Sequence, residues 1–345
     1  MNKLLIIYGP TITGKTRLGI HLAKKISAKG GPASGWQGEI ISADSRQVYR
    51  GMDIGTGKDL PVISNFKSIS NDKFQIGYYL MDGIKTWMLD VVEPNQEFSI
   101  AQYVDLAQKV IKDVWRRKKL PILLGGTGFY IKGLIDGIET LGVEPDWELR
   151  MRLESRPAQK LFDLLSRIDP IKAASLNASD RKNPRRLIRA IEIASKSRRL
   201  ETATAKAGSR YGGKDQRQKI SAEILCIGLK AELKELYKRI DGRVEERVKL
   251  GVEKEIKKLI EKGYSWNLPA MSAMGYREWQ PFFEGKATKE EVIQKWKFDE
   301  HGYARRQLTW FKKDERIEWF DITSPGFKSK VEKLVESWYT GLNAE

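Results

Sequence analysis

The chain has 345 residues, 41% of them hydrophobic, which is enough for one large or two ordinary domains with a real core. Its formal net charge of +17 predicts a polyanionic partner, and no stretch approaches the roughly 20 apolar residues that a membrane span needs. A single cysteine and two isolated histidines exclude an internal disulfide and a zinc site, and the N-terminal apolar run is too short for a signal peptide, so we expect a cytoplasmic protein.

The chain opens with a predicted buried strand, residues 4–8, and a predicted helix, residues 16–28. Between them, GPTITGKT fits the pattern G-x-x-x-x-G-K-[ST] in its required strand-to-helix setting, although an ordinary glycine turn is the alternative. Such a loop directs backbone N–H groups and a lysine at phosphate oxygens, and its hydroxyl can ligate Mg²⁺. The predicted diphosphate-binding residues are Gly9, Pro10, Thr11, Ile12, Thr13, Gly14, Lys15 and Thr16, with Thr16 as the metal ligand.

A second predicted strand, residues 39–43, delivers Asp44 to its carboxyl end, where ligands bind in an open parallel sheet. Asp44 is a metal ligand, a general base or a cap, and the residues alone leave these three readings open. Alternating apolar residues between 74 and 80 favour a hairpin or lid strand, and residues 88–92 predict a core strand.

A third strand and helix pair completes the pattern of an α/β core. Ser99 and Gln102 form a predicted capping box before an amphipathic helix that extends to Trp115. Residues 121–124 predict a buried strand that ends in a glycine-rich turn with Thr127, which either contacts a phosphate or caps the next helix. Three alternations of strand and helix predict a three-layer α/β architecture.

From residue 141 the strand signals stop, and residues 146–200 predict helices. The segment 181–217 holds 12 lysines and arginines against 3 acidic residues, so it carries more than half of the chain's excess charge. A solvated helix face usually mixes both signs, so we favour a nucleic-acid contact over that alternative. Arg185, Arg186 and Arg189 are expected near one face of a helix.

The pattern of a core strand returns at residues 222–229, which makes the helical segment an insertion. A single long helix is expected next, with apolar residues in phase from 233 to 259 and a stop at Gly263. A basic amphipathic helix over 290–313 and a strand over 317–320 follow, and Arg277 alone would be read as a surface arginine.

Six stretches together resemble the tRNA dimethylallyltransferase family and occur in its order: GPTITGKT, ISADSRQVYRGMDIGTGKD, LLGGTGFYIKGLIDG, NPRRLIRAIEI, MSAMGYREW and YARRQLTWFKK. The resemblance implies an α/β, P-loop NTPase-like three-layer core with a parallel sheet, residues 1–140 and 216–345. It also implies an all-helical basic insertion, residues 141–215, that binds the tRNA anticodon stem-loop. The implied reaction transfers a dimethylallyl group from dimethylallyl diphosphate to the exocyclic amine of adenosine 37, with Mg²⁺ as cofactor and a monomer as the active form.

The resemblance also implies roles for single residues. Asp44 matches the carboxylate that accepts the amine proton, Thr127 matches the threonine near the bridging oxygen of the diphosphate, and Arg277 matches an arginine that reaches the diphosphate. Lys15 and Thr16 match the residues that hold diphosphate and Mg²⁺. The residues that match tRNA-touching stretches are Asp44, Ser45, Arg46, Gln47, Arg150, Arg185, Arg186, Leu187, Ile188, Arg189, Ser272, Gly275, Tyr276 and Arg277.

The chain departs from the family's usual pattern at Ile12 and Thr13, where Ala-Ser is common, and at Ser272, where an arginine is common. Because backbone N–H groups bind the phosphates, we expect the loop to keep its function while Ile12 narrows its mouth. The alternatives are a P-loop kinase of a nucleotide or small metabolite, a prenyltransferase of free adenylate, and a non-catalytic RNA-binding module.

Overall fold

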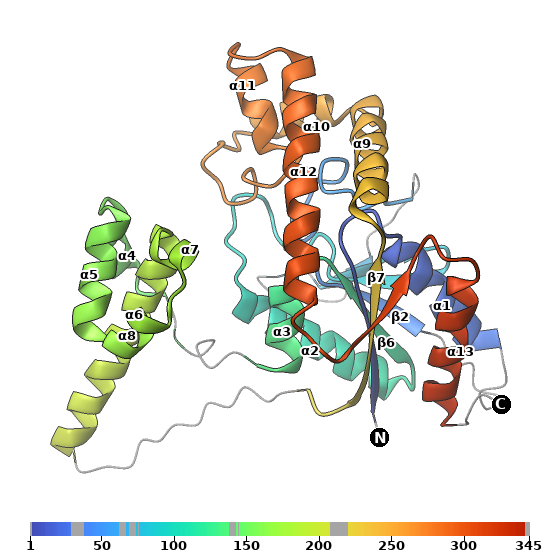
Figure 1. The fold of residues 1–345 in the computed structure, drawn as a ribbon, viewed down its shortest axis with the longest axis horizontal. Coiled ribbons are helices and arrows are strands. Elements are labelled where there is room, and N and C mark those ends of the chain that lie inside the picture. Colours follow the sequence, from blue (N-terminus) through green and yellow to red (C-terminus); the bar gives the residue numbers. More distant parts are fainter. Residues whose placement is uncertain are drawn as a thin grey trace. The chain divides into compact units, whose positions relative to one another are not determined.

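The computed structural model describes residues 2–28, 38–61, 67–68, 74, 76–137, 143, 145–207 and 220–341. The chain divides into two compact units, which are described separately below (Figure 1). Unit 1 comprises Met1–Asp136 and Ile220–Glu345, and unit 2 comprises Gly137–Lys219. None of the helices in these described segments has the length and apolar character of a membrane span.

Unit 1 is built on an eight-stranded sheet in the order β3-β4-β5-β2-β6-β1-β7-β8. The six strands from β5 to β8 in this order pair in parallel, and β3 and β4 join the edge antiparallel. Their bounds are β1 Lys3–Tyr8, β2 Gly38–Ser42, β3 Lys67–Ser68, β4 Gly77–Met81, β5 Ile84–Trp87, β6 Leu120–Gly125, β7 Glu223–Lys230 and β8 Ile317–Asp321. The strands predicted around residues 4–8, 39–43, 121–124, 222–229 and 317–320 are confirmed.

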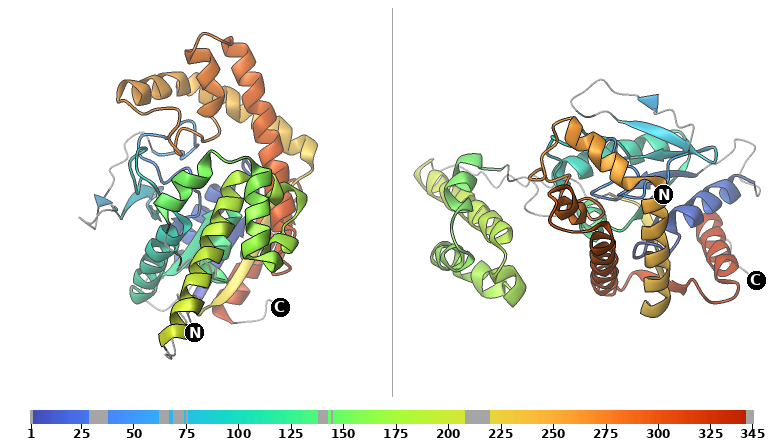
Figure 2. Two further views of the ribbon diagram at one scale, coloured as in Figure 1. Left: turned by 90° about the vertical axis from the view of Figure 1, so that its left-hand side faces the viewer. Right: turned by 90° about the horizontal axis from the view of Figure 1, so that it is seen from above.

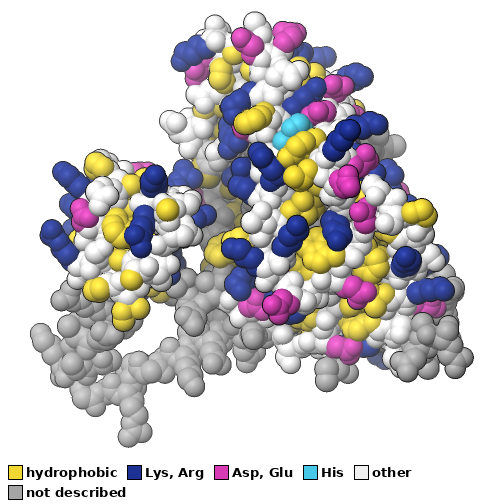
Figure 3. All heavy atoms as spheres, in the orientation of Figure 1, with side chains coloured by type: hydrophobic (Ala, Val, Ile, Leu, Met, Phe, Trp, Pro, Cys, Tyr) yellow, Lys and Arg dark blue, Asp and Glu magenta, His cyan; other side chains and the backbone are white. Residues whose placement is uncertain are grey.

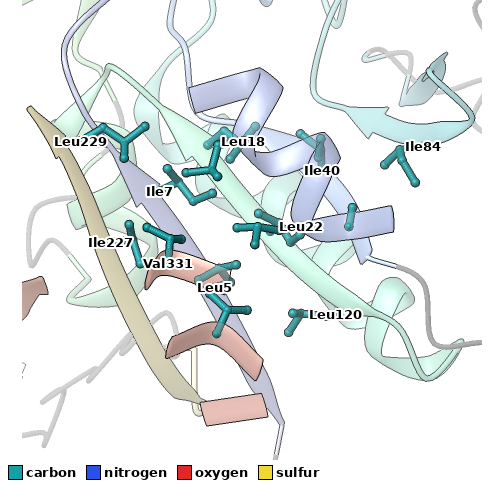
Figure 4. Packing of buried hydrophobic residues seen from close by; sticks show 14 of the residues in the cluster. Leu5, Ile7, Leu18, Leu22, Ile40, Ile84, Leu120, Ile227, Leu229 and Val331 are labelled. Atoms are coloured by element: carbon teal, nitrogen blue, oxygen red, sulfur yellow. The ribbon is translucent and has the colours of Figure 1, made fainter. Parts of the chain in front are cut away.

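Helices cover both faces of this sheet, so the predicted three-layer architecture is confirmed. Helices α1 (Lys15–Ala28) and α13 (Phe327–Thr340) cover one face, and α2 (Ile100–Arg116) and α3 (Gly128–Ile135) contact strands of the sheet from the other (Figure 1). Alternate residues of the central strands pack on α1 and α13 in a single apolar cluster (Figure 4). Labelled members include Leu5, Ile7, Leu22, Ile227 and Val331. The predicted capping box of α2 is present.

The chain that follows β5 differs from the prediction at residues 88–92. These residues form no strand beyond an isolated bridge from Val92, and the strand of the hairpin, β5, ends at Trp87. Met88 and Asp90 have φ values of 66° and 53°, which an extended strand does not allow. The carboxylate of Asp90 is instead bound to the buried ammonium of Lys58. This buried ion pair explains why an apolar run leaves the strand geometry.

The single long helix expected over 233–262 is two helices, α9 (Leu233–Leu250) and α10 (Val252–Glu261). Gly251 separates them with a left-handed backbone, φ 94°, and the two axes diverge there (Figure 2). The described part of unit 1 also contains η2 (Arg277–Trp279), α11 (Gln280–Phe283) and α12 (Lys289–Phe311). α9 and α12 pack against each other and stand above the carboxyl end of the sheet (Figure 1).

The described residues of unit 2 form helices and no strand, as the sequence predicts, and the unit has its own core. Its helices are α4 Trp147–Glu154, α5 Ala158–Ile168, α6 Pro170–Ser175, α7 Ala178–Arg181 and α8 Pro184–Ala207. Leu187 and Ile188 of α8 lie in this core, with 0% and 8% of their surface exposed. Their side chains pack against the neighbouring helices, so the tRNA contact expected at these two positions stays a prediction for the backbone alone.

Candidate functional site

Three neighbouring strands of unit 1 bring the predicted site residues to one edge of the sheet. β1, β6 and β2 lie side by side, and the chain leaves their carboxyl ends at the GPTITGKT loop, at Gly126 and at Asp44. A pocket of about 870 Å³ opens there, and Lys15, Thr16 and Asp44 all line it. Its size is typical of a small-molecule site.

Side chains of the GPTITGKT loop, which we call the phosphate loop, form hydrogen bonds to the backbone of the same loop. The hydroxyl of Thr13 and the ammonium of Lys15 both donate to the carbonyl of Pro10, at 2.9 and 2.7 Å. Ile12 adopts φ 70°, a left-handed conformation that is costly for a β-branched residue, and its side chain lines the pocket. Burial lowers the pKa of Lys15 to about 8, and the negative charge of Asp44 acts in the opposite direction. That coupling shows that the cation and the carboxylate share one electrostatic environment.

The structure shows Asp44 as a cap, here of a turn, and its readings as a metal ligand and as a general base stay predictions. Its Oδ1 accepts the backbone N–H groups of Arg46 at 2.8 Å and Gln47 at 3.4 Å, so it caps the turn after β2. Its Oδ2 has no hydrogen-bond partner among the residues that the structure describes. One carboxylate oxygen thus fixes the turn, and the other is available to a ligand in the pocket that Asp44 lines.

Thr127 does not cap the following helix, which removes one of its two readings. Its hydroxyl oxygen accepts the backbone N–H of Ser45 at 3.1 Å, and no side-chain cap bond is formed. The backbone N–H of Thr127 also donates to the carbonyl of Ala43. These bonds join the loops after β6 and β2. Thr127 itself is not among the residues that line the pocket, although Gly125 and Gly126 are.

The GYR segment contributes one exposed side chain and two buried positions. Arg277 lines the pocket and is about half-exposed, and its guanidinium pairs with Glu278 and Asp299. Ser272 lines the same pocket. Gly275 and Tyr276 are buried, and Tyr276 is 0% exposed, so neither presents a side chain to the surface, and their tRNA contacts stay a prediction.

The comparisons with known proteins identify the family. A family model described as IPP transferase matches residues 47–314. The tRNA dimethylallyltransferase of Roseiflexus castenholzii is 37% identical over 343 residues, which cover 98% of this chain and 99% of that relative. The chain belongs to the IPP transferase family. A second member, the tRNA dimethylallyltransferase of Carboxydothermus hydrogenoformans, is 36% identical over 337 residues. The match covers 96% of this chain and 96% of that relative.

Solved structures agree with this IPP transferase assignment and with the P-loop NTPase-like fold. The full-length tRNA isopentenylpyrophosphate transferase from Bacillus halodurans has a TM-score of 0.63 and 33% identity, and the match covers 99% of this chain and 97% of that one. A eukaryotic dimethylallyltransferase described as acting on tRNA has a TM-score of 0.74 at 23% identity, with 100% and 81% covered, and supports the fold alone.

Several residues of this IPP transferase pocket were not found from the sequence. Gln307 of α12 accepts the backbone N–H of Thr11 and donates to the carbonyl of Gly126, and Arg247 pairs with Glu300 at 3.1 Å inside the same pocket. Tyr303 and Arg306 of α12 line it too. Each side chain reaches the pocket from a helix remote in sequence. The YARRQLTWFKK stretch gave a signal for Tyr303, Arg306 and Gln307, but no stretch gave one for Arg247 or Glu300.

In unit 2 the predicted arginines fall into two groups. Arg150 and Arg189 both bind Glu192, whose side chain is 1% exposed, and Arg150 does so through two bonds of 2.9 Å. Burial opposes ionisation of Glu192, but the bonds from these arginines outweigh it and lower its pKa. Arg185 and Arg186 are exposed instead, and Arg186 pairs with Asp180. Lys and Arg side chains outnumber acidic ones on the face of unit 2 seen in Figure 3.

Proposed function

We propose that the chain transfers a dimethylallyl group from dimethylallyl diphosphate to the exocyclic amine of adenosine 37 in tRNA. The observation that carries the proposal is the pocket in which the Lys15 loop and the carboxylate of Asp44 meet. An anion site explains the diphosphate, and a carboxylate with one unused oxygen beside it explains the proton acceptor. A kinase reading explains the loop but gives no purpose to the basic helical unit.

In the proposed reaction the amine nitrogen forms a bond to the allylic carbon as the bond from that carbon to the diphosphate oxygen breaks. The diphosphate leaves with the electron pair, and the amine proton moves to Oδ2 of Asp44. Lys15, the loop N–H groups and Arg277 neutralise the leaving group in a preorganised field. Because an allylic carbon bears positive charge well, a weak nucleophile suffices, and Asp44 need not be strongly basic.

The residues present fit a magnesium ion. The hydroxyl of Thr16 lines the pocket beside Lys15, and Mg²⁺ is commonly held by one or two protein oxygens together with substrate phosphates. Among the described residues no cluster of three histidine, cysteine, aspartate or glutamate side chains forms a dedicated metal site. When bound, the ion would add positive charge to the diphosphate, and Thr16 would hold it.

The proposed RNA partner is the anticodon stem-loop, which would contact exposed side chains of unit 2 and partly buried ones beside the pocket of unit 1. Arg185 and Arg186 of unit 2 supply phosphate contacts, and Ser45, Arg46 and Ser272 of unit 1 are the proposed contacts beside the pocket. The target base must leave its stack to enter a pocket. We also propose a monomer as the active form and the cytoplasm as its compartment, where the free thiol of Cys226 would stay reduced.

A label-transfer assay tests this function. Purified protein is incubated with labelled dimethylallyl diphosphate and either tRNA, the same tRNA with inosine at position 37, adenosine monophosphate, or no acceptor. We expect label only in the first tRNA, because inosine has no exocyclic amine. Label in adenosine monophosphate would favour the adenylate prenyltransferase, and label in none of the acceptors would contradict the prenyl transfer.

A further inference from the structure

One carboxylate joins two of the stretches that carry the family resemblance. Oε2 of Glu255, on α10, accepts the backbone N–H groups of Asp53 at 2.9 Å and Ile54 at 2.8 Å. Its Oε1 accepts the backbone N–H of Gly55 at 3.1 Å and the hydroxyl of Tyr276 at 2.6 Å. Glu255 thus ties the loop after Met52 to the GYR segment, although it belongs to neither.

The loop and the GYR segment are also packed too closely to move independently. A Cβ on Gly55 would lie 2.4 Å from the ring of Tyr276, and a Cβ on Gly275 would lie 2.7 Å from the carbonyl oxygen of Gly55. The hydroxyl of Tyr276 remains a donor, because burial first and the charge of Glu255 second raise its pKa well above the usual value. The two segments and Glu255 therefore form one rigid corner of the pocket.

This corner is connected to both proposed reactive groups. On one side the side-chain amide of Gln47 donates to the carbonyls of Thr56 and Gly57 at 3.4 and 3.1 Å, while the backbone N–H of Gln47 donates to Oδ1 of Asp44. On the other side Tyr276 directly precedes Arg277, which lines the pocket. Glu255 itself does not line it.

We propose that Glu255 is a positioning residue that fixes Asp44 and Arg277 relative to each other. The inference rests on the proposed prenyl transfer. Glu255 holds no substrate; it removes the freedom of the loop over residues 53–57 and of the segment over 275–277 at the same time. The proton acceptor, Asp44, and the cation at the leaving group, Arg277, are then held at a fixed separation. A transfer in which one bond forms while another breaks requires such fixed geometry.

The test compares three variants with a matched control. Glu255→Ala removes all four bonds, Glu255→Gln keeps one acceptor oxygen, and Tyr276→Phe removes a single bond. The control is Glu253→Ala on the same helix, where the carboxylate pairs with Lys289 at 2.6 Å away from the loop. We expect Glu255→Ala to lower the single-turnover rate about 10²-fold while tRNA binding stays within about twofold. Glu255→Gln should recover part of that rate, and Glu253→Ala should match the unmodified chain.

A second measurement does not depend on enzymatic activity, and it can also be made if one of the variants does not fold. Amide hydrogen exchange is followed by mass spectrometry over peptides that span residues 44–57 and 272–277. Glu255→Ala, or Tyr276→Phe if the alanine variant does not fold, should speed exchange in both peptides together. Faster exchange in only one peptide, or a rate of Glu255→Ala equal to that of Glu253→Ala, would overturn the positioning role. If the unmodified chain transfers no label, the proposed function fails, whereas the exchange experiment still decides whether the coupling exists.

Discussion

The amide of Gln307 reaches the phosphate loop from a helix nearly 300 residues later in the chain. Its Oε1 accepts the backbone N–H of Thr11 at 3.0 Å, and its Nε2 donates to the carbonyl of Gly126 at 2.9 Å. The side chain of Gln307 is buried, and its two backbone partners, Thr11 and Gly126, are partly buried at the pocket. Helix α12 therefore fixes the loop that binds diphosphate against the end of β6.

Replacement of Gln307 by leucine should loosen this loop. The partly buried N–H of Thr11 and carbonyl of Gly126 would each lose a partner, at about 0.5–1.5 kcal/mol per bond. We expect the KM for dimethylallyl diphosphate to rise about tenfold, with a smaller change in kcat, because ground-state and transition-state binding suffer alike. Steady-state kinetics with saturating tRNA measure both, and Gln294→Leu on the exposed face of α12 is the control. An unchanged KM would contradict a role of Gln307 at the loop.

Activity should fall above about pH 8 through Lys15. Its pKa is lowered to about 8, so the ammonium is protonated below that pH and loses its charge above it. Since kcat/KM reports the free enzyme, kcat/KM for the diphosphate should decline from about pH 8 upward. Lys15→Arg keeps its charge at every pH tested and should show a flat profile, at whatever level of activity it retains. The same decline in both proteins would exclude Lys15 as its source.

Charge reversal on unit 2 should weaken tRNA binding in a salt-dependent way. Arg185→Glu with Arg186→Glu removes two exposed cations and leaves the Glu192 cluster intact. Each lost phosphate contact lowers the slope of log K against log salt by about 0.7 to 1. Filter binding over a salt series measures this slope. Lys328→Glu with Lys330→Glu, an equal charge change on α13, should leave it nearly unaltered, and equal effects of both pairs would argue for non-specific attraction.

Two glycines of the α9 segment should respond to alanine with opposite signs. Gly251 has φ 94°, where a Cβ is strained, so Gly251→Ala should destabilise unit 1 by about 1–2 kcal/mol. Gly242 lies inside α9, and an added Cβ would meet nothing within 4 Å, so Gly242→Ala should stabilise unit 1 by about 0.5–1 kcal/mol. Thermal unfolding of the two variants measures both. A neutral Gly251→Ala would contradict the left-handed break between α9 and α10.

The sequence predicts the strands and helices of the core well because their signals are local. An apolar run ending in a glycine turn reports both burial and direction, so β1, β2, β6 and β7 are found together with the ends at which Asp44 and Lys15 stand. The prediction fails where one distant polar contact decides the backbone. Asp90 forms an ion pair with Lys58 and leaves the strand geometry, and no feature of residues 88–92 predicts this ion pair.

The supporting residues of the site are harder to predict for the same reason. Glu255 and Gln307 stand on amphipathic helices, where a glutamate or glutamine is ordinarily a solvated residue. Glu192 gives a weak signal, since it is an acid within an apolar run of a basic segment, between Ile191 and Ile193. Leu187 and Ile188 show the converse: a stretch matched as a whole to RNA contact contains core residues, and only burial separates them from Arg185.

The most direct test of the central claim is the single-turnover rate of Asp44→Asn at saturating tRNA and dimethylallyl diphosphate. Asparagine keeps the side-chain oxygen that accepts the N–H groups of Arg46 and Gln47, so the turn after β2 is preserved while the proton acceptor is lost. We expect the rate to fall about 10²–10⁴-fold with tRNA affinity nearly unchanged, and Asp44→Ala to fall at least as far. A near-normal rate of Asp44→Asn would contradict the assignment of Asp44 as the base.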